Sequence, residues 1–150
     1  MHYSNKITFA EVLDKSNLVD NMEKQILIVE NGARPASDIR DWVFRNPVIP
    51  VFVGNGIEAL LWLGKGNIPD LIFAEVEMGL MPGIQFVQYL KASGFFNEIP
   101  ILAFGNPNKH EGLAAMMQAG ASDYLVRPVT EKEIAACVDK YLSLQLAIKK

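Results

Sequence analysis

Five short apolar runs recur along the chain, separated by stretches in which apolar residues return at helical spacing. The runs cover residues 26–29, 48–53, 71–76, 100–104 and 124–126. Short runs rich in valine, isoleucine and leucine are typical of parallel strands that are buried on both faces. We therefore predict five strands, and Pro50 places the second of them at or near an edge of the sheet.

The segments between these runs have the pattern of amphipathic helices. The expected helices cover residues 35–44, a stretch after residue 56, a stretch around residues 86–90, residues 109–119 and residues 130–146. In the first of them we expect Ile39, Val43 and Phe44 to face inward. Thr130 and Glu133 have the spacing of a capping box and mark the start of the last helix.

Strands and helices alternate five times, which predicts an α/β fold with a five-stranded parallel sheet between two layers of helices. The alternation begins at Lys24, so residues 1–23 form a separate leader. The spacing of Phe9, Val12 and Leu13 fits one stripe of a short helix, and a partly ordered leader is an equally open interpretation. We expect one domain over residues 24–146 and a short tail at 147–150.

Composition limits what such a domain does. Half of the 150 residues are hydrophobic, the net charge is -3 and the pI is about 5.4, so we expect no general attraction to nucleic acid. The lone Cys137 excludes a disulfide framework. No stretch approaches the roughly 20 apolar residues that span a bilayer, and we expect a cytoplasmic protein. No Ser-His-Asp or Cys-His set falls at the strand ends, so we expect no enzyme.

Functional residues of a parallel sheet gather beyond the carboxyl ends of its strands. The residues at these ends are Glu30, Asn31, Glu75, Glu77, Gly105, Asn106 and Arg127. Two carboxylates from neighbouring strands would bind a divalent cation through oxygen. An arginine beside them would instead pair with a carboxylate. Both a ligand site and a structural salt bridge between Glu75 and Arg127 remain open on spacing alone.

Several segments resemble the response regulator receiver domain, also called CheY-like. The run GASDYLVRP over residues 120–128 is similar to the family's GA-x-x-Y-x-x-K-P segment, and PDLIFAE over residues 69–75 is similar to its PDLILLD strand. NGIEAL over residues 55–60 resembles the DGEEAL helix start, and Gly83 falls where the family has a glycine after its phosphorylation loop. The resemblance covers residues 24–145 and implies the flavodoxin-like strand order.

The chain departs from this family at the positions that carry its chemistry. The resemblance places Glu75 at the phosphoacceptor aspartate, and Glu30 with Asn31 at the acid pair that holds Mg²⁺. Gly105 stands where the hydroxyl residue bonds the phosphoryl group, and Arg127 replaces the phosphate-pairing lysine. The switch aromatic is retained as Tyr124.

These changes predict an atypical receiver that is not phosphorylated in the usual way. Glutamate at position 75 moves the carboxylate by more than an ångström, and such displacements are costly in catalysis. Asn31 removes a negative charge from the cation site, so Mg²⁺ held by Glu30, Glu75 and Glu77 is expected to bind weakly if at all. Glu75 paired with Arg127 either mimics a phosphorylated aspartate or is vestigial. A weakly active phosphoacceptor and a small-ligand binder are the alternatives.

The resemblance also implies that the domain works through protein–protein contacts. We expect partners such as a histidine kinase or a separate output protein, and no further cofactor. Receivers use the face formed by their fourth helix, fifth strand and fifth helix for partners or for a homodimer. In this chain that face would include Leu113, Met117, Tyr124 and parts of residues 131–142.

Overall fold

Five parallel strands form the centre of the computed structural model, which describes residues 24–31 and 38–142. The strands are β1 (Gln25–Val29), β2 (Ile49–Val53), β3 (Leu71–Glu75), β4 (Ile101–Gly105) and β5 (Asp123–Val126). Their order in the sheet is β2-β1-β3-β4-β5, and each neighbouring pair is parallel. The predicted five-stranded sheet with its flavodoxin-like order is confirmed, as is the edge position of the strand that contains Pro50.

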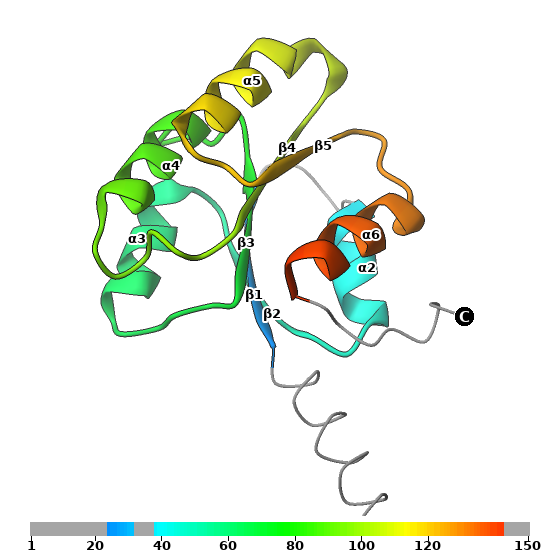
Figure 1. The fold of residues 1–150 in the computed structure, drawn as a ribbon, viewed down its shortest axis with the longest axis horizontal. Helices are drawn as coiled ribbons and strands as arrows, with labels where there is room; N and C mark the ends of the chain where they lie inside the picture. Colours follow the sequence, from blue (N-terminus) through cyan, green and yellow to red (C-terminus); the bar gives the residue numbers. More distant parts are fainter. Residues whose placement is uncertain (1–23, 32–37, 143–150) are drawn as a thin grey trace, which may run out of the picture.

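Helices cover both faces of this sheet (Figure 1). One layer holds α2 (Asp38–Arg45) and α6 (Glu131–Leu142). The other holds α3 (Gly56–Gly64), α4 (Gly83–Ala92) and α5 (His110–Ala119), with the 3-10 turn η2 (Pro107–Lys109) in front of α5. The result is the three-layer α/β/α arrangement. The leader at 1–23, the start of the first predicted helix at 35–37 and the segment beyond residue 142 lie outside the described residues.

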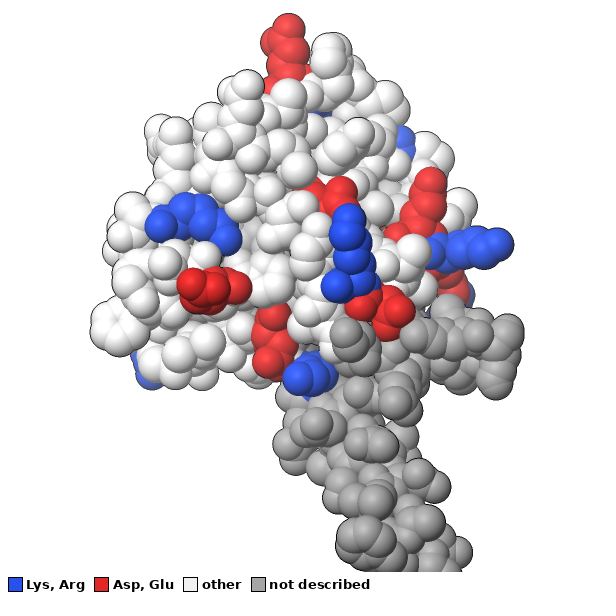
Figure 2. Space-filling view, viewed as in Figure 1, with Lys and Arg blue, Asp and Glu red and all other residues white. Residues whose placement is uncertain are grey.

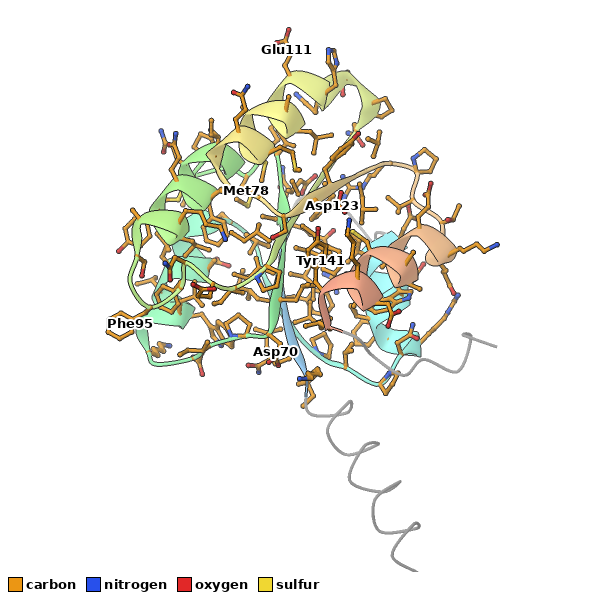
Figure 3. All side chains as sticks on the ribbon, in the orientation of Figure 1. Asp70, Met78, Phe95, Glu111, Asp123 and Tyr141 are labelled. Atoms are coloured by element: carbon orange, nitrogen blue, oxygen red, sulfur yellow. The ribbon has the colours of Figure 1, made fainter. Side chains whose placement is uncertain are left out.

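The alternation of side chains along β1 explains why the sheet has two hydrophobic cores. Ile26 and Ile28 pack in the core under α2 and α6, whereas Leu27 and Val29 pack in the core under the other three helices. All four are fully buried. Burying a side chain of this size stabilises the fold by about 1.5–3 kcal/mol, and side chains fill the space on both sides of the sheet (Figure 3).

Helix α2 buries a different set of residues from the one predicted. Ile39 and Val43 are buried as expected, but Phe44 is 65% exposed and Trp42 is the third buried residue. Positions 39, 42 and 43 follow the i, i+3, i+4 spacing of one helix face, and position 44 lies to the side of that face. Phe44 instead contacts Phe52 at the outer edge of the sheet, with 5.6 Å between ring centroids.

Local signals at the helix ends act as the sequence indicates. The Glu133 backbone N–H donates to the Thr130 hydroxyl, and the Thr130 N–H donates to the Glu133 carboxylate, both at 3.0 Å. This is the predicted capping box, and it satisfies two backbone donors at the start of α6. Asn55 caps α3 in the same way through the N–H of Glu58. Among the described residues, no helix is long and apolar enough to cross a membrane.

Candidate functional site

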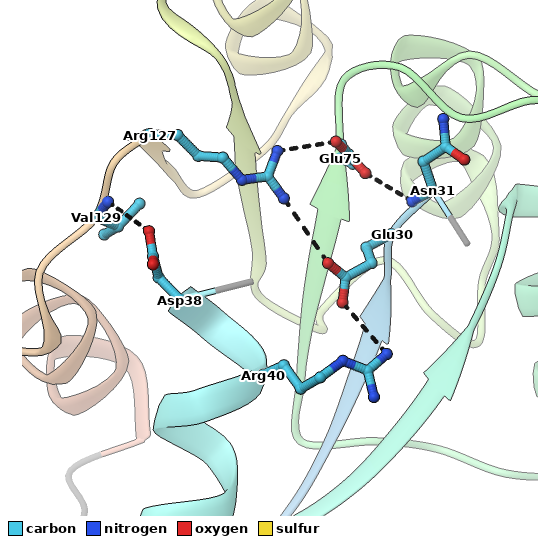
Figure 4. A network of polar contacts seen from close by, with 7 residues as sticks. All are labelled: Glu30, Asn31, Asp38, Arg40, Glu75, Arg127 and Val129. Atoms are coloured by element: carbon cyan, nitrogen blue, oxygen red, sulfur yellow. Dashed lines mark hydrogen bonds and ion pairs between the residues drawn. The ribbon is translucent and has the colours of Figure 1, made fainter. Parts of the chain in front are cut away.

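Two buried glutamates and an arginine meet at the carboxyl edge of the sheet (Figure 4). Glu30 directly follows β1, Glu75 is the last residue of β3, and Arg127 directly follows β5. Strands β1 and β3 are neighbours, so their carboxyl ends place the two glutamates side by side. Glu30 is 4% exposed and Glu75 2% exposed, and they are the two charged residues that are buried in the described part of the chain.

Arg127 lies between these carboxylates. Its Nη1 is 2.9 Å from Oε2 of Glu75, a hydrogen-bonded ion pair, and its Nη2 is 3.7 Å from Oε2 of Glu30. The guanidinium also stacks 4.9 Å from the centroid of the Phe104 ring. A buried carboxylate without a nearby positive charge costs several kcal/mol. Arg127 therefore offsets the desolvation of two carboxylates at once.

Two further groups complete the network. The backbone N–H of Asn31 donates to Oε1 of Glu75 at 2.6 Å, so both oxygens of that carboxylate accept a hydrogen bond. On the outer side, Nη2 of Arg40 lies 3.7 Å from Oε1 of Glu30, and its guanidinium stacks on Phe52. The chain Arg40–Glu30–Arg127–Glu75 contains two positive and two negative charges, which balance without a metal ion.

Sequence reasoning missed Arg40 as a member of this site. It follows Ile39 on α2, and the helix carries it to the carboxyl end of β1 and to the edge strand β2. The available signal was a basic residue in the predicted helix that follows the first strand. Asp38, one residue earlier, was also missed, and its carboxylate accepts the backbone N–H of Val129 at 2.9 Å.

The structure separates Glu77 from the two glutamates with which it was grouped as a candidate metal ligand. Its carboxylate pairs with Nζ of Lys109 at 2.8 Å on the surface. Within the described residues, no three His, Cys, Asp or Glu side chains are arranged to hold a metal ion. Mg²⁺ prefers several oxygen ligands in octahedral geometry, and the two carboxylates of the pocket face guanidinium groups instead. The residues present do not fit that ion.

Gly105 and Tyr124 occupy the remaining predicted positions. Gly105 ends β4 and joins the pocket through its backbone, where its carbonyl accepts the N–H of Arg127 at 2.9 Å. A Cβ at position 105 would lie 3.0 Å from Cγ2 of Val76, so another side chain already fills that space. Tyr124 lies on the edge strand β5 with 49% of its surface exposed. The predicted switch residue thus lies at the surface.

Beside Tyr124, an apolar groove of about 450 Å³ runs between α5 and β5. Its lining residues are His110, Leu113, Ala114, Met117, Gln118, Tyr124 and Val126. The other side of β5, towards α6, is more polar. There the Tyr141 hydroxyl donates to the carbonyl of Ser122 at 2.8 Å and lies near Asp123 (Figure 3). On the face drawn in Figure 2, basic and acidic side chains are interspersed, so that face carries no single-sign field.

Cys137 is buried under this polar side. Burial, with the negative charge of Asp123 and a hydrogen bond to it, raises the pKa of the Cys137 thiol to about 12. Burial also raises the pKa of Tyr141, with Asp123 adding to the effect. Because a thiol reacts as its thiolate, Cys137 is held in its unreactive form near neutral pH.

Comparison with known proteins shows which family the described fold resembles. A sequence model of the response regulator receiver domain matches residues 26–139. The Escherichia coli (strain K12) protein Regulator of RpoS is 29% identical over 108 residues, which cover 72% of this chain and 31% of that protein. The chain spans between about a quarter and a half of the length of such curated relatives.

Solved structures share the same fold. The signal receiver domain of a signal transduction histidine kinase from Syntrophus aciditrophicus is 26% identical, with a TM-score of 0.72 over 81% of this chain and 91% of that one. The receiver domain of a sensor histidine kinase from Pseudomonas aeruginosa PAO1 is 20% identical, with a TM-score of 0.71 over 80% of this chain and 98% of that one. That structure has a magnesium ion coordinated in its active-site cleft.

Proposed function

This chain belongs to the response regulator receiver domain family, and from that premise we propose that it is a signalling module in which a fixed ion-pair network replaces the phosphorylation site. The observation that carries the proposal is the position of Arg127. Its guanidinium lies 2.9 Å from Glu75 and 3.7 Å from Glu30, inside a pocket where both carboxylates are buried. The module acts in two-component signal transduction through protein–protein contacts and has no catalytic activity of its own.

Glu75 is poorly placed to accept a phosphoryl group. Its Oε2 accepts a hydrogen bond from Arg127 and its Oε1 accepts one from the Asn31 backbone. Either oxygen would have to give up a charge-assisted or buried hydrogen bond before attacking phosphorus, and such bonds are worth about 1.5–3 kcal/mol each. The longer glutamate side chain also displaces the nucleophile from the position of an aspartate, which phosphoryl transfer tolerates badly.

Arginine side chains in the pocket already balance the negative charge that a magnesium ion would otherwise neutralise. Bound Mg²⁺ would offset the negative charge that develops on a transferring phosphoryl group. Here Arg40 and Arg127 already stand beside the carboxylates of Glu30 and Glu75, and a dication in the same space would be repelled by both guanidinium groups. We propose that the arginines take over the structural task of balancing charge and that signalling by this domain does not depend on Mg²⁺.

Two observations separate mimicry of a phosphorylated state from a structural ion pair. The short contact between Glu75 and Arg127 fits either interpretation. Tyr124 is half exposed on β5, and the glycine at position 105 has no side chain to connect it with Glu75. We propose that the pair is a structural element that holds the strand ends together, and that the domain remains in one state rather than responding to phosphorylation.

The face made by α5, β5 and α6 is the surface that we propose for partner binding. Its groove of about 450 Å³ is lined mainly by apolar side chains, with Leu113 and Met117 on one wall and Tyr124 on the other. Grooves of this size and chemistry suit an apolar anchor from another protein. We propose a histidine kinase or a separate output protein as the partner, with a homodimer through the same face as the alternative.

The test is incubation of the whole chain with acetyl phosphate and Mg²⁺, followed by intact mass spectrometry. We expect no added phosphoryl group under conditions in which an active receiver domain, run in parallel, becomes labelled. Glu75→Gln is the matched variant that removes the candidate acceptor. A phosphoryl adduct on the wild-type chain that is lost in Glu75→Gln would overturn the proposal in favour of a weakly active phosphoacceptor.

A further inference from the structure

The side chain of Val76, the residue after Glu75, is seated in a socket made by two glycines. A Cβ built on Gly112 would lie 2.4 Å from Cγ1 of Val76, and a Cβ built on Gly105 would lie 3.0 Å from its Cγ2. Each methyl group of the valine therefore occupies the space of a missing side chain. Two glycines from different elements, the end of β4 and the first turn of α5, make room for one branched side chain.

Gly112 has no conformational reason to be a glycine. It lies inside α5 (His110–Ala119), and glycine within a helix costs about 1 kcal/mol relative to alanine. By contrast, a Cβ at Gly64, a helical glycine of α3, would meet nothing within 4 Å. The difference indicates that the close approach of Val76 is what requires glycine at position 112.

Backbone and charge contacts hold the same segments together. The N–H of Val76 donates to the carbonyl of Phe104 at 2.9 Å, and its carbonyl accepts the N–H of Gly83 at 3.0 Å. Glu77 then pairs with Lys109 at the start of α5. The residues that follow Glu75 are thus attached to the connection between β4 and α5 by packing, by a hydrogen bond and by an ion pair.

This attachment links the buried pocket to the apolar groove. One wall of the groove includes Leu113, next to Gly112, and the other ends at Val126, next to Arg127. Arg127 pairs with Glu75, and Val76 packs against Gly112. Each wall of the groove therefore contains a residue whose neighbour in the sequence contacts the end of β3. Gly112 contacts Val76, and Arg127 contacts Glu75.

We propose that Val76 is a positioning residue that fixes α5 against the end of β3 and so holds the groove in a single geometry. A Cβ at position 105 would lie 3.0 Å from Cγ2 of Val76, so Val76 would have to move by a few tenths of an ångström to admit the hydroxyl side chain that the resemblance places there. The use of the groove for partner binding rests on the proposed function, whereas the packing of Val76 against the two glycines does not.

The test is a double-mutant cycle on the whole chain with Val76→Ala, Gly112→Ala and the pair together. We expect Gly112→Ala to lower the melting temperature by roughly 3–10 °C, as overpacking of a core does. Gly64→Ala is the matched control, and it should leave the melting temperature unchanged or slightly raised. The double variant should recover most of the loss caused by Gly112→Ala, because the alanine methyl group then enters the space that Val76 has left.

A second measurement separates positioning from simple stability. The ¹³C-methyl resonance of Met117, in the groove, should shift in Gly112→Ala and return towards its wild-type position in the double variant. Amide exchange over residues 110–119 should quicken in Val76→Ala. If Gly112→Ala behaves like Gly64→Ala, or if Met117 does not respond to either change, the inference is wrong. Neither result depends on phosphorylation, so failure here is distinguishable from failure of the acetyl phosphate test.

Discussion

The strand-end pocket and the groove beside β5 lie on the same molecule and differ in almost every physical respect. The pocket is buried and charged, and Arg127 pairs within it with Glu75. The groove is open and apolar, and Tyr124 on its wall is half exposed. The pocket uses its polar groups to satisfy one another, while the groove leaves apolar surface accessible. The difference separates a region whose charges are satisfied within the fold from a region that leaves apolar surface open, and the proposed function assigns stability to the first and partner binding to the second.

Removal of Arg127 should produce the largest effect, because it would leave Glu30 and Glu75 buried beside each other. We expect Arg127→Met to lower the free energy of unfolding by about 3–5 kcal/mol, measured by urea denaturation. Arg45→Met is the control, since Arg45 pairs with Glu131 on the surface and should cost about 0–1 kcal/mol. Equal effects of the two substitutions would mean that the pocket is not a distinct stabilising element.

Glu75→Gln tests the same ion pair by changing the carboxylate that Arg127 contacts. The amide keeps the shape of the side chain but removes the charge that Arg127 pairs with, so we expect a loss of about 1–3 kcal/mol in urea denaturation. The matched change Glu77→Gln alters a surface pair with Lys109 and should stay within about 1 kcal/mol. A larger loss for Glu77→Gln than for Glu75→Gln would reverse the assignment of the buried network.

The Cys137 thiol, on the polar side of β5, should make the free energy of unfolding depend on pH in the alkaline range. The pKa of the Cys137 thiol is about 12 in the folded chain, against an ordinary value of 9.0. The folded state therefore holds this proton more tightly, and the resulting stability is complete below about pH 9 and decreases as the pH rises towards 12. We expect the free energy of unfolding to fall less steeply between pH 9 and 11 in Cys137→Ala than in the wild type.

The same protonated thiol should resist alkylation. Iodoacetamide at pH 8 should label Cys137 slowly in the folded chain and rapidly in urea, as followed by mass spectrometry. Fast labelling of the folded chain would contradict the burial of this thiol.

Substitution of Tyr124 should have the smallest effect on the free energy of unfolding, because Tyr124 belongs to the groove and not to the buried pocket. Its side chain is half exposed, and we expect Tyr124→Ser to change the free energy of unfolding by no more than about 0.5–1 kcal/mol. If the α5–β5–α6 face forms a homodimer, sedimentation velocity will show weaker association in this variant at unchanged stability. A loss comparable with that of Arg127→Met would place Tyr124 in the core rather than on a binding surface.

The architecture followed from the sequence because each strand and helix carries its own signal. The apolar runs, Pro50 and the capping box at Thr130 all acted locally as predicted. The prediction for Phe44 was wrong because Trp42, and not Phe44, shares the buried helix face of Ile39 and Val43. Helical spacing counted from Ile39 was the available signal for this difference.

The candidate site followed only in part. Spacing and resemblance brought Glu30, Asn31, Glu75 and Arg127 to one edge, and the salt bridge between Glu75 and Arg127 was one of the two open interpretations. Arg40 was missed because its contact with Glu30 depends on how α2 crosses the strand ends. The outward position of Tyr124 depends likewise on three-dimensional packing, which residue identity alone does not specify.

Pro50 has a consequence for how this protein avoids aggregation. The strand β2 is an apolar edge beside β1, and on its inner side the N–H of Ile49 donates to the carbonyl of Lys24 while the carbonyl of Val53 accepts the N–H of Glu30. Backbone groups alternate along a strand, so the nitrogen at position 50 points to the open side. An edge of this kind is a template on which another chain can add a strand. A proline there offers no hydrogen to a visiting chain and interrupts the template at the second residue of the strand.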